Sequence, residues 1–175
     1  MMSGFSPNPR LSSVRVHRQD GHEETGNGRM PTDRLSDEAP YRLDRPRCAQ
    51  DWQAYHGIRR KVFNLPRPDE AIDPGCHPLL LWLQDQPIGA IQIDDLHNAA
   101  AALRLVAIDP AWQARGHGRA LLDQAEKFVR NLGCGKAVVY ATPEAAGFYA
   151  QAGYDEEDWD DICMGGIVQM LKKLD

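Results

Sequence analysis

The stretch Leu105–Leu122 reads LVAIDPAWQARGHGRALL, and it joins the patterns that together decide the fold. Its first residues end an apolar strand, which stops at Asp109-Pro110 because proline cannot donate a ladder hydrogen bond. Its last residues begin the strongest amphipathic helix of the chain, which Gly133 ends. One face of that helix carries the apolar residues Leu121, Leu122, Ala125, Phe128, Val129 and Leu132. A strand, a glycine-containing loop and a helix therefore follow one another directly.

The loop between this strand and this helix, QARGHGR, has the composition of an anion-binding site. Gly116 and Gly118 let the backbone turn tightly and let a ligand approach without a Cβ in the way. The amides of Ala114 to Arg119 then converge at a helix N-terminus, where the helix dipole favours an anion. The two arginines of the loop add positive charge, so a ligand of the size of a pyrophosphate fits.

Two widespread phosphate motifs do not match this loop. A dinucleotide-binding fingerprint would need a third glycine at position 121, where the chain has Leu121. A P-loop would need Gly-Lys followed by Ser or Thr, which this loop lacks. A glycine turn that merely leads into a helix stays open as the alternative to a binding loop.

Helix and strand patterns alternate on both sides of the loop. Helices are expected over 48–63 and from Thr142-Pro143 to Ala152, in addition to the helix that ends at Gly133. Strands are expected over 79–83, 87–94, 103–108, 136–141 and 166–171. The first two strands form a hairpin across Gln84-Asp85-Gln86, and a Pro-rich loop precedes them up to Gly75. This order predicts a mixed α/β sheet with at least one parallel crossover.

The first 40 residues differ from those that follow. They contain Ser, Gly, Pro, Asn and charged residues without apolar periodicity, so they cannot bury enough surface to offset their ordering entropy. Met1 to Arg18 is basic and faintly resembles a transit peptide, but it has no sustained amphipathic pattern. We therefore expect a flexible N-terminal extension over 1–40 and one domain over 41–175, as suits a chain of 175 residues.

Composition excludes several classes of protein. The 20 Lys and Arg residues against 25 Asp and Glu give a net charge of −5, whereas a nucleic-acid binder needs a basic face. An apolar run of about 18 residues, as a membrane span needs, is missing. The cysteines are Cys48, Cys76, Cys134 and Cys163, too scattered for a zinc site or a disulfide framework. We expect a cytoplasmic protein with reduced cysteines, no metal, and neither a nucleic-acid nor a membrane partner.

Two motifs that occur in order give the chain a family likeness. LVAIDP at 105–110 is followed by Q-x-x-G-x-G from Gln113, and AGFYAQAGY follows at 146–154. Together they resemble the GNAT superfamily of acyl-CoA N-acyltransferases, in which such a loop wraps the pyrophosphate of acetyl-CoA. A weaker likeness covers IRRKVF at 58–63 and PIGA at 87–90. The resemblance implies the GNAT fold, a central mixed sheet splayed between two parallel strands with helices on both faces.

The resemblance also implies an activity. It implies an N-acetyltransferase that transfers the acetyl group of its cosubstrate, acetyl-CoA, to a primary amine by direct attack in a ternary complex. The acceptor would be a small amine or a peptide. Two other interpretations stay open: a non-catalytic acyl-CoA-binding or regulatory module with the same fold, and a regulator that binds a nucleotide in the same loop. The oligomeric state is open too, a homodimer included.

Site residues follow from the same resemblance. Those implied to bind the cosubstrate are Val106, Ala107, Ile108, Gln113, Ala114, Arg115, Gly116, His117, Gly118 and Arg119. The three strand residues would contact the pantetheine arm through the main chain, and the Ile108 amide would polarise the thioester carbonyl. Tyr149 is the implied general acid, since a phenol with a pKa near 10 is protonated at pH 7. Packing in the core is the alternative role for Val106, Ile108 and Tyr149. At position 142 the family often has Asn, and this chain has Thr142.

Neither the general base nor the acceptor is assigned by the sequence. Candidate bases are His77, His97, His117, Asp94 and Asp95, and a water molecule is an equal candidate. The segment Asp155–Asp161 has six carboxylates in seven residues, which would attract a cationic acceptor or form a solvated loop. Arg104 on the central strand would instead favour a carboxylated acceptor.

Overall fold

The computed structural model describes residues 40–64, 74–157 and 166–175. Three of the sequence-based expectations therefore fall wholly or mainly outside the described residues. These are the N-terminal extension over 1–40, the Pro-rich loop up to Gly75, and the part of the acidic segment from residue 158 onward.

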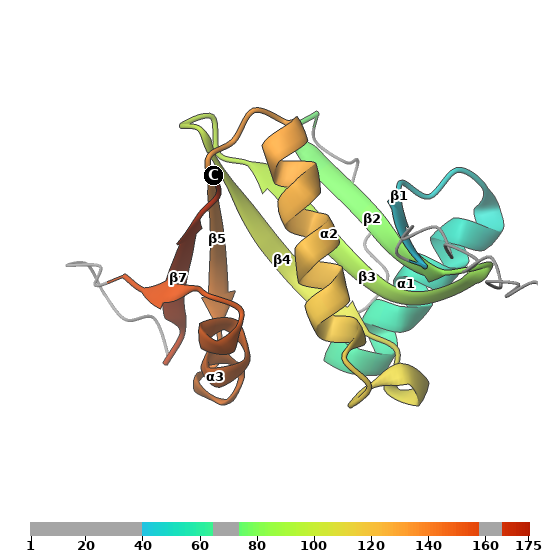
Figure 1. The fold of residues 1–175 in the computed structure, drawn as a ribbon. Coiled ribbons are helices and arrows are strands. Elements are labelled where there is room, and N and C mark those ends of the chain that lie inside the picture. Colours follow the sequence, from blue (N-terminus) through green and yellow to red (C-terminus); the bar gives the residue numbers. More distant parts are fainter. Residues whose placement is uncertain (1–39, 65–73, 158–165) are drawn as a thin grey trace, which may run out of the picture. The chain divides into compact units, whose positions relative to one another are not determined.

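The fold is a seven-stranded sheet in the order β1-β2-β3-β4-β5-β7-β6, with helices on both faces (Figure 1). The strands are β1 (Tyr41–Asp44), β2 (Cys76–Leu83), β3 (Gln86–Asp95), β4 (Ala100–Ile108), β5 (Lys136–Ala141), β6 (Asp155–Glu156) and β7 (Val168–Lys173). The helices are α1 (Ala49–Phe63), α2 (His117–Asn131) and α3 (Pro143–Gln151), with a 3-10 turn η1 (Pro110–Trp112). The pair β4 and β5 is parallel and every other pair is antiparallel. The predicted mixed sheet with its parallel crossover is confirmed.

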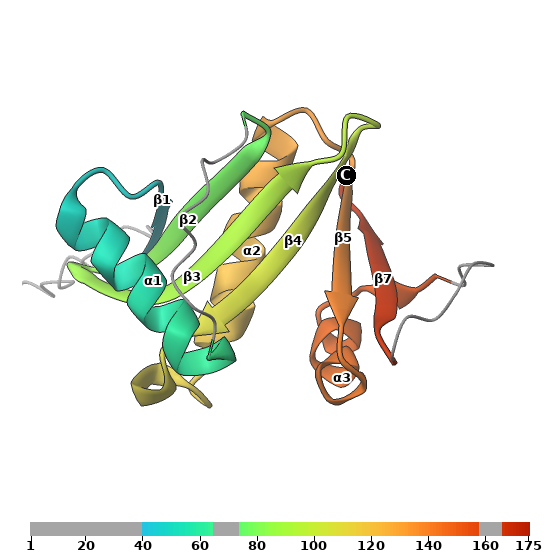
Figure 2. The same cartoon turned by 180° about the vertical axis from the view of Figure 1, so that it is seen from behind.

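The parallel strands β4 and β5 diverge after a short shared ladder. They pair from Ala100 opposite Lys136 to Leu103 opposite Val139, and within the described residues no further pairs join them. Figures 1 and 2 show the two strands running apart from this point. The predicted splay between the two parallel strands is therefore confirmed.

A β-bulge accompanies the divergence. Arg104 pairs with Gln92 of β3 and Ala107 pairs with Ala90, so two residues of β4 lie opposite the single residue Ile91. Leu105, the first of the two, has φ +51°, which lies in the left-handed region. A bulge bends the strand that carries it and increases its local twist. The strand expected over 103–108 is therefore not regular at this point, because the extra residue breaks the period of two.

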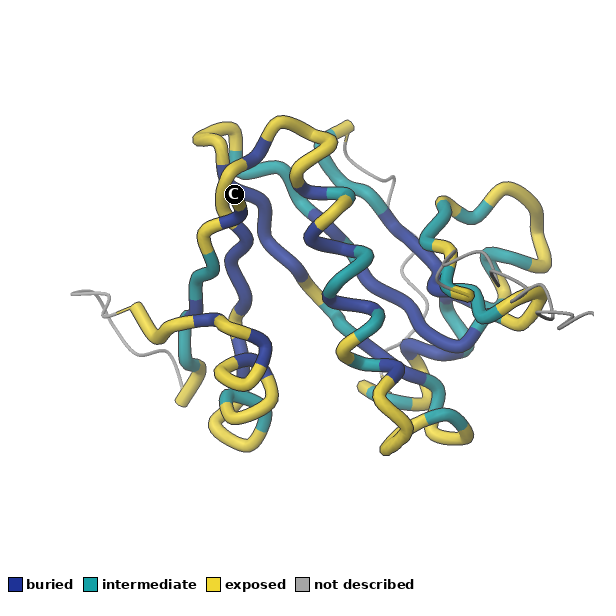
Figure 3. The backbone as a smooth tube through the Cα atoms, in the orientation of Figure 1, coloured by how far each residue is buried: buried dark blue, intermediate teal, exposed yellow. Residues whose placement is uncertain are grey.

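Apolar side chains pack on both faces of the sheet. The larger core lies under α2 and α3 and includes Leu81, Ile91, Leu103, Leu122 and Met170. The smaller core lies under α1, where Tyr55 and Ile58 pack against Leu80, Ala90 and Ala107. Figure 2 shows α1 across the face opposite α2, and Figure 3 shows the central strands buried along most of their length. Burial on both faces explains the nearly continuous apolar runs of β2 and β4.

Several boundaries differ from the predicted ones. The hairpin turn is Gln84-Asp85 alone, with Gln84 at φ +54°, and Gln86 is already in β3. The last strand begins at Val168 instead of Gly166. Strand β1 was not expected from the sequence, because its four residues YRLD alternate too briefly to give a pattern. Among the described residues, no helix is long and apolar enough to cross a membrane.

Gly57 offers a test of α1 as described. It lies inside the helix, and a Cβ added there would meet no atom within 4 Å. Gly57→Ala should raise the free energy of unfolding by about 0.5–1 kcal/mol, since glycine costs that much in a helix interior. Thermal unfolding measures it, with Gly133→Ala as the contrasting variant. Gly133 has φ +81°, so alanine there should lower stability, and equal effects at both sites would contradict the assignment.

Candidate active site

The loop after β4 presents a series of unpaired amides. Ala114 has φ +58° and Gly116 φ +82°, so the backbone turns sharply before α2 begins at His117. In the described part of the chain, the amides from Ala114 to Gly118 have no hydrogen-bond partner. The Arg119 amide, which we expected to be free as well, donates to the Gly116 carbonyl at 3.1 Å. Five consecutive unpaired amides remain at the N-terminus of a 15-residue helix, where an anion is favoured.

The loop side chains hold this backbone in place. Gln113 Nε2 donates to the Ile108 carbonyl oxygen at 2.9 Å and ties the loop to the end of β4. His117 Nδ1 lies 2.8 Å from the Tyr41 hydroxyl, and the imidazole packs edge-on against Trp112. The His117 side chain is therefore buried between β1 and η1, which leaves its amide as the group available to a ligand. The Arg115 guanidinium lies over the Trp112 ring at 5.8 Å.

Ile108 ends β4 with its amide on the open side of the strand. The Asp109 amide donates to Ile88 of β3 at 2.9 Å, and successive peptide groups of a strand point to opposite sides. The Ile108 N–H therefore points away from β3, toward the side from which β5 has diverged. The side chains of Val106 and Ile108 pack in the larger core and Ala107 in the smaller one, so their main chain is what a ligand could contact.

Tyr149 lies in α3, on the same face of the sheet as α2. It belongs to the same core cluster as Ile108, and it makes edge-on ring contacts with Phe148 and Tyr154. Burial raises the pKa of Tyr149 to about 12. Within the described residues its hydroxyl has no hydrogen-bond partner, so it is free to donate. The loop approaches α3 at Gly118, where an added Cβ would lie 3.2 Å from the Phe148 ring.

Two cations fasten the end of α3 to α2. Arg119 Nε lies 3.1 Å from Asp123, and its terminal nitrogen donates to the Gln151 carbonyl at 3.0 Å. Lys172 of β7 lies 2.8 Å from both oxygens of Glu126 and donates to the Ala152 carbonyl at 2.9 Å. Cations at a helix C-terminus are stabilised by the helix dipole and by its unpaired carbonyls. These contacts, which we call the α3 clamp, join helices that pack on opposite sides of the divergence between β4 and β5.

Thr142 precedes α3 in extended conformation but does not cap the helix with its side chain. The carboxylate of Glu144 accepts hydrogen bonds from its own backbone amide and from the Thr142 hydroxyl, and these hold the pKa of Glu144 below its ordinary value. The Thr142 hydroxyl is therefore engaged within the first turn of α3.

Among the candidate bases only His117 belongs to the loop, and its ring is engaged with Tyr41. Asp94 of β3 lies opposite Ala102, six residues before Ile108, which corresponds to about 20 Å along the strand. Asp95 pairs with His97 at the same end of the sheet. His77 packs against Phe128 and contacts Arg45, and burial followed by the Arg45 charge lowers its pKa.

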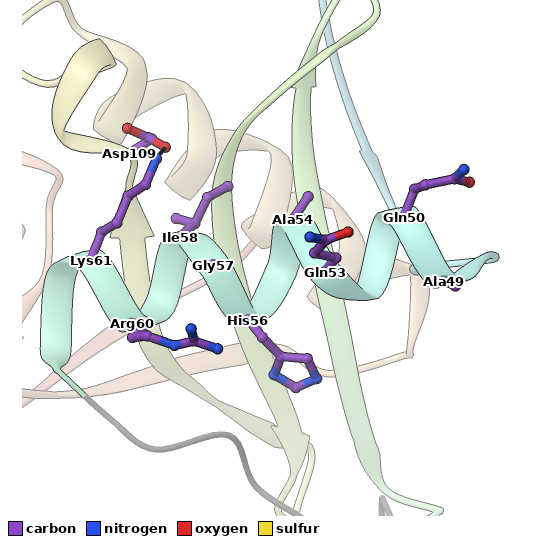
Figure 4. A pocket seen from close by; sticks show the side chains of 10 residues that line it. All are labelled: Ala49, Gln50, Gln53, Ala54, His56, Gly57, Ile58, Arg60, Lys61 and Asp109. Atoms are coloured by element: carbon purple, nitrogen blue, oxygen red, sulfur yellow. Dashed lines mark hydrogen bonds and ion pairs between the residues drawn. The ribbon is translucent and has the colours of Figure 1, made fainter.

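A hollow of about 800 Å³ runs along α1 and reaches the end of β4 at Asp109 (Figure 4). Lys61 spans that end, with its ammonium 2.6 Å from the Asp109 carboxylate. Burial tends to raise the pKa of Asp109, but the hydrogen bonds from Lys61 and from the Ala111 amide outweigh it and leave the pKa lowered. This pair was not predictable from the sequence, because 48 residues separate its members.

A comparison with known families gives a match over residues 38–154 to the acetyltransferase (GNAT) family. The chain belongs to the GNAT family. The resemblance that its motifs suggested is therefore confirmed. The match covers the loop, the clamp residues of α2 and the whole of α3.

Two relatives of this GNAT chain are similar to it in sequence. A Bacillus subtilis (strain 168) protein named as a candidate acetyltransferase is 24% identical over 131 residues, 70% of this chain and 88% of that protein. Glucosamine 6-phosphate N-acetyltransferase 1 of Oryza sativa subsp. japonica is 36% identical over 53 residues, 30% of this chain and 32% of that enzyme.

Solved structures share the fold. The PaiA N-acetyltransferase of Thermoplasma acidophilum, in complex with coenzyme A, superposes with a TM-score of 0.59 at 17% identity. The alignment covers 76% of this chain and 98% of that one. The N-acetylglutamate synthase of Neisseria gonorrhoeae, complexed with coenzyme A and L-arginine, gives a TM-score of 0.63 at 15% identity over 77% of this chain and 33% of that one.

Proposed function

We propose that this GNAT protein is an acetyl-CoA-dependent N-acetyltransferase that acts on a primary amine by direct attack in a ternary complex. The observation that carries the proposal is the coincidence of three features at the divergence of β4 and β5. These are the open-side amide of Ile108, the five unpaired amides of the loop, and the free hydroxyl of Tyr149. The relatives that bind coenzyme A support the choice of cosubstrate. We assign the activity to residues 41–175.

In this proposal the loop holds the pyrophosphate of acetyl-CoA. The amides of Ala114 to Gly118 donate to its oxygens, and the Arg115 side chain supplies a nearby cation. Arg119 acts differently from our expectation, because its guanidinium and its amide already have partners. The pantetheine arm then runs into the space between β4 and β5, where its amides pair with main-chain groups of Val106 to Ile108.

Acetyl transfer would proceed in two bond changes. The neutral amine attacks the thioester carbonyl carbon, a C–N bond forms, and the Ile108 N–H donates to the resulting oxyanion. The C–S bond then breaks, and the departing sulfur takes a proton from the Tyr149 hydroxyl. The nitrogen loses its extra proton to water. The Tyr149 phenolate then takes a proton from the solvent. Asp94 and Asp95 lie far along the sheet from Ile108, and the His117 ring is engaged with Tyr41, which supports a water molecule in the role of base.

The raised pKa of Tyr149 suits a proton donor to sulfur. At a pKa of about 12 the phenol stays protonated at every physiological pH. The thiolate of the leaving group has an ordinary pKa near 8.5, but the burial that disfavours the tyrosinate also disfavours the thiolate. Burial therefore acts on both groups in the same direction, and the raised pKa of Tyr149 serves to keep its hydroxyl protonated until the sulfur departs.

Calorimetry with acetyl-CoA, CoA and ATP tests the binding half of the proposal. Binding of acetyl-CoA and CoA, with none of ATP, is expected, whereas selective ATP binding would favour the nucleotide-binding regulator. Acceptors are then screened among polyamines, amino acids, aminoglycosides, peptides and glucosamine 6-phosphate, the last because of the rice relative. Tight acetyl-CoA binding with no acetyl transfer to any of these would favour the non-catalytic module.

Gly118→Val should weaken acetyl-CoA binding about tenfold or more. A side chain at Gly118 would crowd the loop amides, and its Cβ would already lie 3.2–3.3 Å from the Phe148 ring. The matched control is Gly135→Val, since a Cβ at Gly135 meets no atom within 4 Å. Calorimetry on both variants, with circular dichroism to check folding, makes the comparison.

A second variant separates the two effects of that substitution. Phe148→Ala removes the ring that the new side chain would strike, so Gly118→Val with Phe148→Ala keeps only the obstruction of the loop. Affinity that stays low in the double variant supports anion binding by the loop. An unchanged affinity in a folded Gly118→Val variant would refute the loop assignment.

A further inference from the structure

Four polar residues form a chain of contacts across β3, β4 and β5. Gln92 Nε2 donates to Asp94 Oδ1 at 3.0 Å, and Asp94 Oδ2 lies 2.8 Å from Arg104 Nε. The Arg104 guanidinium in turn lies over the Tyr140 ring, 5.6 Å from its centroid. The proposed function uses none of these side chains.

This group lies where β4 and β5 part, on the face that α1 partly covers. Leu103 and Val139 are the last paired residues of the two strands, and both side chains belong to the larger core under α2. Arg104 and Tyr140 are the next residues along each strand, so their side chains point to the opposite face. They are exposed there: the Arg104 side chain is 49% accessible and Tyr140 42%, whereas Ala101 and Ala102 are fully buried.

The direction of the cosubstrate places this group beyond the thioester, along β4. The loop that would hold the pyrophosphate lies beyond Ile108, at the wide end of the divergence. A pantetheine arm that starts there places its thioester at the Ile108 amide and points toward the narrow end. Arg104 lies in that direction, about 10 Å away along β3, because the partners of Ile108 and Arg104 on that strand are three residues apart. An acceptor that extends from the thioester toward the narrow end therefore meets the Arg104 side chain. Tyr149 approaches from the face of α2 and α3, which leaves the face of Arg104 for the acceptor amine.

We propose that Arg104 binds an anionic group of the acceptor, a carboxylate or a phosphate, and so selects amines that carry one. This rests on the proposed acetyltransferase function. Asp94 holds Nε and Tyr140 supports the plane of the guanidinium, so the side chain is oriented before any acceptor binds. Within the described residues its two terminal nitrogens donate no hydrogen bond, and they form the fork that binds a carboxylate or phosphate with two hydrogen bonds.

The same contacts argue against a cationic acceptor at this position. Both Asp94 oxygens are already occupied, one by Gln92 and the other by Arg104. An ammonium group would have to displace one of these partners and would lie close to the guanidinium charge. An anion displaces neither partner, and two hydrogen bonds from the guanidinium offset its repulsion by the Asp94 carboxylate.

The test uses acceptor pairs that differ in one anionic group. The pairs are glucosamine 6-phosphate against glucosamine, and L-amino acids against their amides, each assayed for N-acetylated product by mass spectrometry. In the natural protein the anionic member of at least one pair should have the higher kcat/KM. Arg104→Gln should lower kcat/KM for that member by about ten- to hundredfold, to the level of the neutral member. The KM for acetyl-CoA should stay within about twofold.

Arg42→Gln is the matched control. Arg42 also pairs with an aspartate, Asp44, and also lies over an aromatic ring, that of Trp82, but it is in the edge strand β1. The Arg42→Gln substitution should therefore leave the preference for the anionic acceptor intact. Arg104→Lys keeps the charge but loses the fork, so it should recover only part of the preference.

Each outcome bears on one of the two proposals. A preference that survives in Arg104→Gln, or a natural preference for neutral or cationic amines, overturns the role of Arg104 and leaves the acetyltransferase intact. If no acetyl transfer occurs, calorimetry of the same acceptors on CoA-saturated protein tests whether Arg104 binds an anionic group. If the natural protein binds the anionic acceptor and Arg104→Gln does not, the role of Arg104 stands although the acetyltransferase proposal fails. If neither protein binds it, the role of Arg104 is overturned as well.

Discussion

Tyr149→Phe should lower kcat by about 10²- to 10⁴-fold and leave the affinity for acetyl-CoA nearly unchanged, since a general acid contributes a factor of that size. The corresponding rise in the activation barrier is about 3–5 kcal/mol. The substitution removes one hydroxyl and keeps the ring, so the edge-on contacts with Phe148 and Tyr154 should persist. Steady-state kinetics with an identified acceptor, and calorimetry with acetyl-CoA, measure the two quantities.

The neighbouring Tyr154→Phe is the control for this variant. Tyr154 packs against Tyr149, and burial followed by the nearby Glu126 charge raises its pKa too, but the proposal gives its hydroxyl no proton to transfer. Its kcat should stay within about threefold of the natural protein. If Tyr149→Phe also stays within about threefold while chemistry limits the rate, Tyr149 is not the acid and water protonates the sulfur.

The pH profile gives an independent check on Tyr149. An acid works only in its protonated form, so the activity that depends on it is complete below its pKa and is lost as the pH rises through that value. With a pKa of about 12, Tyr149 should cause no decline in kcat below about pH 11. A decline near pH 10 that disappears in Tyr149→Phe would show that its hydroxyl titrates as in an exposed phenol.

Lys172→Met should lower the free energy of unfolding by about 3–5 kcal/mol, because it leaves a buried carboxylate without its partner. The Glu126 side chain is only 5% accessible, and Lys172 contacts both of its oxygens. The substitution also frees the Ala152 carbonyl at the end of α3. Urea unfolding measures the loss, with the exposed Lys127→Met as the control, which should change stability little.

A double variant tests the stated cause of that loss. Glu126→Leu with Lys172→Met replaces the pair by apolar side chains and should recover most of the stability, because no charge remains buried. If the double variant is as unstable as Lys172→Met, the loss comes from the Ala152 contact or from packing. If Lys172→Met itself costs less than about 1 kcal/mol, the pair does not stabilise the fold.

Elements with a long apolar period were predictable from the sequence. The helix over 48–63 is confirmed as α1 because its apolar residues repeat at helical spacing, and α2 is confirmed with its end before Gly133. The strand over 136–141 matches β5 at both ends. The bulge at Leu105 was not predictable, because LRLV alternates as well as any regular strand and the extra residue appears only against β3.

Part of the candidate site was also predictable from the sequence, and part was not. The position of the loop and of Tyr149 followed from two motifs in order, because short segments carry both. The α3 clamp did not, since 46 residues separate Glu126 from Lys172 and 32 separate Arg119 from Gln151. Such contacts depend on how the helices and strands pack against one another, which the local spacing of residues does not reveal. The contacts of Arg119 with α3 were not predictable for the same reason. Its position beside the glycines had instead suggested that it binds a phosphate.

The divergence of β4 and β5 also gives this sheet two inner edges. An exposed strand edge usually invites pairing with another chain and so promotes aggregation. Here the outer edge strands are short, β1 with four residues and β6 with two, and both carry charged side chains. The inner edges of β4 and β5 face each other below α2 and α3. Each strand therefore restricts the access of a foreign strand to the inner edge of its neighbour. The fold thereby keeps unpaired backbone next to its proposed site without offering that backbone to neighbouring molecules.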